Sequence, residues 1–264
     1  MKLKDILKNT EMKNFTFIYL DETIKYRPYK TKEEKELLIA LTTNDYKTIE
    51  NTLFNIIIEC TTIENPKQYP LFVLFELVKN IRIVSVGNII DFEPICECGT
   101  KNAMQIKLDN VTFLPPKENL KLRLDENIEI EFKYLTIENE THIIEEIELN
   151  NLNSDFLYKK NKDRTKEEIQ QYQENKINSA LYKIACMIYK VKTKDNVLKD
   201  MDIQERLEFV YELNREYRNR IIDFIMNIEK KIPSTTIVEV SNCVKCGKEL
   251  KEEFGGNLID FFVN

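Results

Sequence analysis

An α+β fold is predicted for this chain by three observations. Apolar residues recur at helical spacing in several long segments, strand-like stretches lie between these segments, and closely spaced cysteines follow two of the strand-like stretches. The chain has 264 residues, 42% of them apolar, which is enough for one large domain or two small ones. We expect a helical N-terminal region, a small antiparallel β module with a split four-cysteine zinc knuckle, and a helical insertion.

Residues 1–90 are predicted to form a strand pair followed by helices. Residues 1–13 suggest a short helix or a loose arm, and the strand-like segments that follow are 15–20 and 23–29. Thr31 and Glu34 have the spacing of a capping box, which predicts the start of a helix. Two further helices are predicted by apolar spacing at 46–60 and by a nearly continuous apolar pattern at 71–82, the latter typical of a buried helix.

Residues 91–135 are predicted to form the β module. Strand-like stretches cover residues 88–95 and 103–108, and clean alternation on both sides of Asp125-Glu-Asn127 predicts a hairpin. The first cysteine pair lies in this module.

Residues 136–232 are predicted to form a helical region. Thr165 and Glu168 form a second capping box, which begins a helix that we expect to extend to about Lys192. Residues 203–228 form the longest periodic segment, with Asn214 at a position where a polar residue can fix coiled-coil register. This segment is either a helix packed inside the protein or a helix for a partner.

Residues 233–264 are predicted to hold a strand, the second cysteine pair and an apolar tail. The strand covers residues 235–240, and the tail covers 257–264. We expect this segment to pack on the β module, with insertion of the tail into a partner as the alternative.

The four paired cysteines are the candidate metal ligands. They are Cys96 and Cys98 in one half-site and Cys243 and Cys246 in the other, and a glycine follows each pair. Two half-sites of this kind supply the four thiolates of a tetrahedral structural zinc, which leaves no open position for water or substrate. Two alternatives are reduced thiols without metal and a disulfide or redox pair. Cys60 and Cys186 stand alone in apolar helical patterns and are predicted to be buried.

The composition and motifs of the chain give little support for a catalytic function. Only five glycines are present and no phosphate-binding glycine motif occurs, while the single histidine, His142, has no partner motif. We therefore predict no enzyme, no catalytic or cofactor-binding residues and no small-molecule substrate. The N-terminus lacks a signal peptide, and no segment is apolar enough to insert into a membrane.

Nucleic-acid binding is the runner-up function, because zinc ribbons often serve in transcription. Against it, the chain has a net charge of −6. Residues 241–254 carry three lysines and three glutamates, so the region of the second half-site is locally neutral.

An ordered run of motifs carries a resemblance to a known family. The run consists of Tyr26-Arg-Pro-Tyr29, Lys32-Glu-Glu-Lys35, a block from Phe75 through Arg82 to Asn88, the first cysteine pair and the hairpin from Leu122 to Tyr134. Over roughly residues 15–140 the chain resembles the baseplate hub proteins of T-even-type tailed bacteriophages. The C-terminal C-x-x-C-G followed by Phe261-Phe262 is also similar to some members, whereas residues 150–232 match only in helical character.

This resemblance implies a structural or chaperone-like assembly protein of the phage tail baseplate hub. Its partners would be other hub proteins, in homo- or hetero-oligomers, and it would act in the host cytoplasm during assembly or remain in the virion. Arg82 is expected to bond carbonyls at the end of its own helix, which it terminates together with Ser85-Val-Gly87, with a contact to a partner as the alternative.

Overall fold

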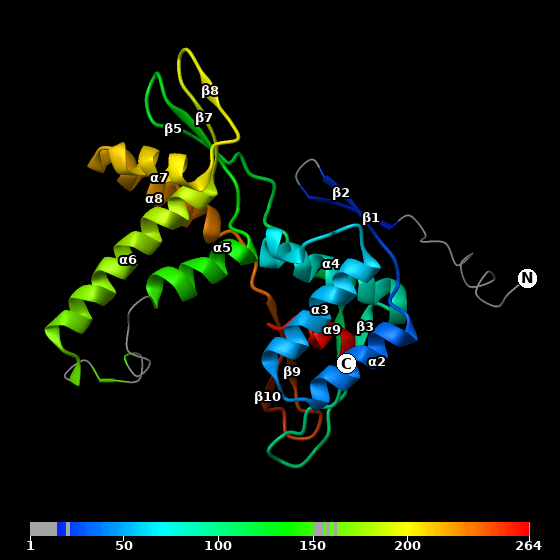
Figure 1. Ribbon diagram of the computed structural model, residues 1–264. Coiled ribbons are helices and arrows are strands. Elements are labelled where there is room, and N and C mark those ends of the chain that lie inside the picture. The colour runs from blue at the N-terminus through cyan, green and yellow to red at the C-terminus, as the bar shows by residue number, and fades with distance from the viewer. Residues whose placement is uncertain (1–14, 20–21, 150–155, 157–158, 161–162, 264) are drawn as a thin grey trace, which may run out of the picture. The chain divides into compact units, whose positions relative to one another are not determined.

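The computed structural model describes residues 15–19, 22–149, 156, 159–160 and 163–263 (Figure 1). The expected helix or arm at residues 1–13 lies outside these residues. The chain divides into two compact units. Unit 1 consists of residues 1–66, 71–114 and 233–264, and unit 2 consists of residues 67–70 and 115–232. The predicted mixture of helices and small antiparallel sheets is confirmed.

The first part of unit 1 is a hairpin followed by helices, as predicted. Its elements are β1 (Phe15–Tyr19), β2 (Glu22–Tyr26), α2 (Thr31–Thr42), α3 (Tyr46–Cys60) and α4 (Leu71–Val86). A short 3₁₀ turn, η1 (Pro66–Gln68), precedes α4, and its residues 67–68 are assigned to unit 2. The strands β1 and β2 pair antiparallel. The helix α4 extends four residues past the predicted end at Arg82, and ten of its side chains are buried.

Helix α2 begins one residue earlier than the predicted capping box implies, and only the glutamate half of such a box is present. The N-cap is Lys30, whose backbone N–H donates to Glu33 Oε2 at 2.6 Å. Glu33 is only 1% exposed, and Arg27 Nη2 donates to its Oε1 at 2.8 Å. The sequence spacing pointed to Thr31 and Glu34, but the burial of Glu33 and its pairing with Arg27 decide the register.

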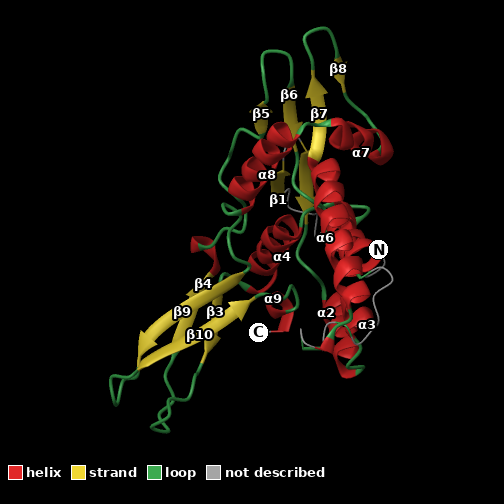
Figure 2. Ribbon diagram, turned by 90° about the vertical axis from the view of Figure 1, so that its left-hand side faces the viewer, coloured by secondary structure: helices red, strands yellow, loops and turns green. Residues whose placement is uncertain are grey.

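The remainder of unit 1 contains two small antiparallel sheets (Figure 2). One pairs β3 (Ile89–Phe92) with β4 (Met104–Lys107), and the other pairs β9 (Thr236–Asn242) with β10 (Glu249–Gly255). Two short helical segments complete the unit, η2 (Leu108–Asn110) and α9 (Asp260–Val263). The strand predicted at residues 235–240 is therefore present and pairs with a partner strand that follows the second cysteine pair.

A buried ion pair attaches the segment after β4 to α4. Lys79 Nζ lies 2.6 Å from Glu76 Oε1 and also donates to the backbone carbonyl of Val111 at 2.6 Å. Glu76 Oε2 accepts from the backbone N–H of Phe113 at 2.9 Å. Because both side chains are almost fully buried, each needs the other as a partner.

The apolar tail packs inside unit 1. The ring of Phe261 is fully buried and contacts the rings of Phe75, Phe113 and Phe254 at centroid distances of 5.2–6.0 Å. Arg82 Nη1 donates to the backbone carbonyl of Phe261 at 3.3 Å. Arg82 is itself buried, and its partner is this carbonyl of α9 and not the expected carbonyls at the end of its own helix. Its role is therefore internal, and the tail fills the core of its own unit.

Unit 2 is a four-stranded antiparallel sheet with helices. The strands, in sheet order, are β5 (Lys121–Arg123), β6 (Glu129–Phe132), β7 (Ile188–Lys192) and β8 (Val197–Leu198). The helices are α5 (Ile137–His142), the π-helical η3 (Ile143–Glu148), α6 (Lys166–Met187), α7 (Ile203–Glu212) and α8 (Arg215–Glu229). Buried residues from β6, β7, α6, α7 and α8 form one core, among them Phe132, Val191, Ile184, Val210 and Ile221.

The expected division of the chain differs from the structure at two places. The stretch 91–135 is split at Leu114, because the predicted hairpin β5–β6 pairs with β7 of unit 2 and not with β3–β4. Residues 136–232 are not helical throughout. The predicted capping box of α6 is present, but the helix ends at Met187 and the chain continues as β7, which buries Ile188 and Val191 against β6.

The long periodic segment at residues 203–228 is two helices. Helix α7 ends at Glu212, and Asn214 is the N-cap of α8, with its Oδ1 accepting from the backbone N–H of Tyr217 at 2.9 Å. The interpretation of Asn214 as a coiled-coil register residue is wrong for this reason. Both helices pack into the core of unit 2, which agrees with the internal alternative.

Candidate metal centre

The first cysteine half-site is a tight turn between β3 and β4. The backbone N–H of Cys96 donates to the carbonyl of Thr100 at 2.9 Å, and the N–H of Gly99 donates to the carbonyl of Cys96 at 2.8 Å. Gly99 has φ +80°, a left-handed conformation that glycine adopts without steric cost. The glycine after the pair therefore lets the chain reverse and present the Cys96 and Cys98 thiols on one side.

The second half-site repeats this arrangement between β9 and β10. The backbone N–H of Cys243 donates to the carbonyl of Lys248 at 2.8 Å, and the N–H of Gly247 donates to the carbonyl of Cys243 at 2.9 Å. Gly247 also has a left-handed φ of +71°. Residues far apart in the chain thus form two similar loops, the second one residue longer between its cysteines, and both belong to unit 1 (Figures 1 and 2).

The two loops bring all four predicted ligands together. Their four Sγ atoms lie within 4.8 Å of one another. The distance from Cys96 Sγ to Cys246 Sγ is 3.6 Å, and the distance from Cys98 Sγ to Cys243 Sγ is also 3.6 Å. A tetrahedral zinc with Zn–S bonds of about 2.3 Å separates its sulfur ligands by roughly 3.8 Å. The four thiols therefore fit a tetrahedral four-thiolate site.

The sequence of this chain matches the profile of a known protein family. The profile of the family described as T4 bacteriophage base plate protein matches residues 12–263, nearly the whole chain. The chain belongs to this family. The resemblance seen in the sequence is thereby confirmed, and family membership supports a structural role in the phage baseplate and interaction with other phage structural proteins. No match was found among curated proteins or among solved structures.

In this baseplate protein a further residue, Asn102, joins the two cysteine loops. Its side chain is buried, its Oδ1 accepts from the backbone N–H of Val244 at 2.9 Å, and its Nδ2 donates to the carbonyl of Thr100 at 2.9 Å. Asn102 was not among the residues predicted from the sequence. The available signal was a polar side chain four positions after Cys98, in a segment that leads into a strand. This signal could not identify the partner of Asn102, which lies 142 positions away in the chain.

An exposed ion pair also connects the loops. Lys248 Nζ lies 2.5 Å from Glu97 Oε2. This contact lowers the pKa of Glu97 and raises that of Lys248. Since both side chains face solvent, the pair contributes little to stability compared with Asn102.

The environment sets different proton affinities for the thiols. Hydrogen bonds from the backbone N–H groups of Cys246 and Lys245 lower the pKa of Cys243 to about 6. Hydrogen bonding to the Thr100 side chain lowers the pKa of Cys98. For Cys96, the backbone of Cys98 acts to lower the pKa, but burial and the neighbouring thiols outweigh it and raise the pKa to about 12. Cys243 is therefore a thiolate at neutral pH, as a metal ligand needs to be.

The other cysteines and the histidine take no part in this centre. Cys60 and Cys186 are buried, as predicted, and burial raises the pKa of Cys60 to about 12 and that of Cys186 to about 11. His142 is exposed and packs against Tyr182 with the two rings tilted by 39° and 4.8 Å between ring centroids. None of the described helices has the length and apolarity needed to span a bilayer.

Proposed function

We propose that this chain is a structural or chaperone-like assembly component of the baseplate hub that acts by protein–protein recognition. The family match over residues 12–263 carries the proposal. The partners are other hub proteins, in homo- or hetero-oligomers. The chain meets them in the host cytoplasm during assembly and either stays in the tail baseplate or leaves when assembly is complete.

A structural zinc on Cys96, Cys98, Cys243 and Cys246 is part of this proposal. It is supported by the mutual distances of the four thiols and by the low pKa of Cys243. Four thiolates in tetrahedral arrangement favour zinc or an iron–sulfur centre, and a single closed site of this size suits zinc. With four protein ligands, the metal would hold structure and would offer no open position for catalysis.

The zinc would act as a clamp within unit 1. The chain leaves unit 1 after Leu114 and returns at Pro233, so unit 2, apart from residues 67–70, is an insertion between the two halves of the centre. A metal bound by both loops connects β3–β4 to β9–β10 and stabilises unit 1 against separation of these segments. Metal binding and folding of unit 1 are then coupled. This leaves the surfaces of both units available for partner proteins.

A tagged version of the chain, expressed during infection by the phage that encodes it, tests the hub assignment. We expect the other hub proteins to co-purify with it from the infected lysate or from tail particles. A Cys243→Ser variant provides the matched comparison, because loss of the clamp should weaken this association without removing any surface of unit 2. Absence of the wild-type chain from hub complexes in both lysate and particles would refute the proposal.

A further inference from the structure

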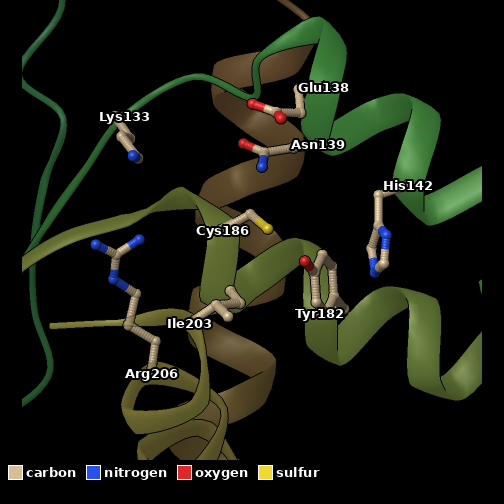
Figure 3. A pocket seen from close by; sticks show the side chains of 8 residues that line it. All are labelled: Lys133, Glu138, Asn139, His142, Tyr182, Cys186, Ile203 and Arg206. Atoms are coloured by element: carbon tan, nitrogen blue, oxygen red, sulfur yellow. The ribbon is translucent and has the colours of Figure 1, made fainter. Parts of the chain in front are cut away.

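A recess in unit 2 has no role in the metal centre. Its volume is about 330 Å³, and it lies between α5, α6, α7 and the chain that follows β6 (Figure 3). Eight residues line it, namely Lys133, Glu138, Asn139, His142, Tyr182, Cys186, Ile203 and Arg206. Figure 3 shows the two cations on one side of this space, the pair of His142 and Tyr182 on the other, and Cys186 between them.

Among the described residues, the two cations of the recess form no salt bridge. Neither the ammonium of Lys133 nor the guanidinium of Arg206 forms a salt bridge there, and the Nε–H of Arg206 is buried without an acceptor. Burial lowers the pKa of Lys133, and the charge of Arg206 lowers it further. Two like charges that face one space, with a buried donor left unsatisfied, form a site that an anion would stabilise.

The remaining lining residues limit the class of anion. Asn139 adds an amide that can donate, and Glu138 adds one negative charge, so the two cations and one carboxylate leave the recess with a net charge of about +1. A phosphate monoester carries about −1.5 to −2 at neutral pH and would face repulsion from Glu138. A carboxylate carries a single negative charge, which matches the recess.

The walls of the recess do not suggest a nucleophilic site. Burial raises the pKa of Cys186 to about 11, so its thiol is protonated at neutral pH. Together with Ile203 and the ring of Tyr182, it forms an apolar wall. An apolar wall beside two cations suits a carboxylate that is attached to a short aliphatic stem.

We propose that this recess binds the carboxylate of a peptide segment of a partner protein. The guanidinium of Arg206 would engage the carboxylate in a fork of two hydrogen bonds, and Lys133 would add a second charge. The carboxylate chemistry follows from the recess alone, whereas the choice of a peptide as its carrier rests on the assembly function proposed above. The source is either an acidic side chain or a chain terminus.

Titration of the full-length, ¹⁵N-labelled protein with three probes tests this site by NMR. The probes are acetyl-Gly-Glu-Gly-amide, acetyl-Gly-Gly-Gly with a free C-terminal carboxylate, and inorganic phosphate. We expect a saturable shift of the Arg206 Nε–Hε signal and of the Asn139 backbone amide with one or both peptides, and the responding peptide identifies the source. A shift with phosphate alone, or with none of the probes, would overturn the proposal.

Variants followed through the Asn139 amide make the test specific. Arg206→Gln should weaken peptide binding about tenfold or more, and Arg206→Lys should weaken it less, because the charge remains and the fork is lost. Glu138→Gln should tighten it about threefold, because a repelling charge is removed. Arg215→Gln, at an exposed arginine of α8 outside the recess, should have no effect. Unchanged binding in Arg206→Gln would refute the site.

The outcome of this titration does not depend on whether the chain is a hub component. The titration uses only this chain and small probes, so its failure leaves the baseplate role intact. Failure of the chain to co-purify with hub proteins would conversely leave carboxylate binding intact.

Discussion

Cys98 Sγ and Cys243 Sγ lie 3.6 Å apart although 145 positions separate the two residues in the chain. This contact shows that the β3–β4 loop and the β9–β10 loop converge on one point. The distance is close to the edge of a tetrahedral four-thiolate zinc site.

Replacing Cys243 with serine should remove the metal. We expect about one zinc per wild-type chain by elemental analysis, and close to none in Cys243→Ser, because three remaining thiolates hold zinc poorly. Thermal unfolding of unit 1 should also shift to lower temperature. Cys60→Ala is the control, since Cys60 is buried in the same unit but lies outside the centre, and its zinc content should not change. A metal-free wild-type protein would contradict the zinc assignment.

Asn102→Ala should weaken zinc binding while leaving all four ligands in place. The substitution removes the acceptor of the Val244 backbone N–H and leaves this group unsatisfied between the loops. We expect a loss of zinc affinity of about tenfold or more, measured by competition with a chelator. Asn110→Ala, after β4 and outside the two loops, provides the comparison. Equal affinity in the two variants would show that Asn102 does not position the loops.

Glu33 should make the stability of the protein depend on pH in the acid range. Burial acts to raise the pKa of Glu33, but hydrogen bonds from Arg27 and the Lys30 backbone outweigh it and hold the pKa below its usual value. A carboxyl group with a lowered pKa in the folded state stabilises the protein above its unfolded pKa of about 4.5, and this contribution is lost as the pH falls through the folded value.

Urea unfolding of wild type and Glu33→Gln at two pH values measures this pH dependence of stability. At pH 7 the variant should be less stable than wild type by about 1–3 kcal/mol. The difference should shrink at a pH below 4.5, because Glu33 becomes protonated first in the unfolded chain and its charge then contributes less to folding. Glu36→Gln, at an exposed position of the same helix, should leave stability nearly unchanged at both pH values. A difference for Glu33→Gln that does not vary with pH would contradict the electrostatic explanation.

Phe261→Ala should destabilise unit 1 strongly. The ring is fully buried among three other aromatic rings, and truncation leaves a cavity in that cluster. We expect a loss of about 3–5 kcal/mol in the free energy of unfolding. Val244→Ala, at a side chain that is 82% exposed, should cost less than about 0.5 kcal/mol. A small effect of Phe261→Ala would mean that the tail does not belong to the core.

Asn214→Ala should reduce stability without changing oligomeric state. The substitution removes the side-chain acceptor for the Tyr217 backbone N–H at the start of α8. Loss of such an N-cap costs about 1 kcal/mol. Chemical unfolding measures the cost and light scattering measures the mass, with the exposed Asn219→Ala in the same helix as the control. A change of oligomer size would restore the coiled-coil interpretation.

Several features of this protein were predictable from the sequence because they depend on neighbouring residues. The capping box of Thr165 and Glu168, the hairpin turn around Asp125 and the buried character of α4 all follow from local spacing. The spacing of the cysteines and the glycine after each pair also indicated two half-sites of one centre. These signals act over a few residues, so they persist in any fold that accommodates them.

The tertiary structure alone decided which segments pair across the chain. Strand β7 forms where a helical pattern continues, because the edge of β6 and the core of unit 2 bury Ile188 and Val191 there. Asn214 became a cap because α7 and α8 pack separately in that core. The role of Asn102 between the cysteine loops could not be predicted, because its partner, Val244, lies far away in sequence. Packing between distant segments overrides the local preference for helix or strand wherever it buries more apolar surface and pairs more backbone hydrogen-bonding groups. No pattern of neighbouring residues encodes that outcome.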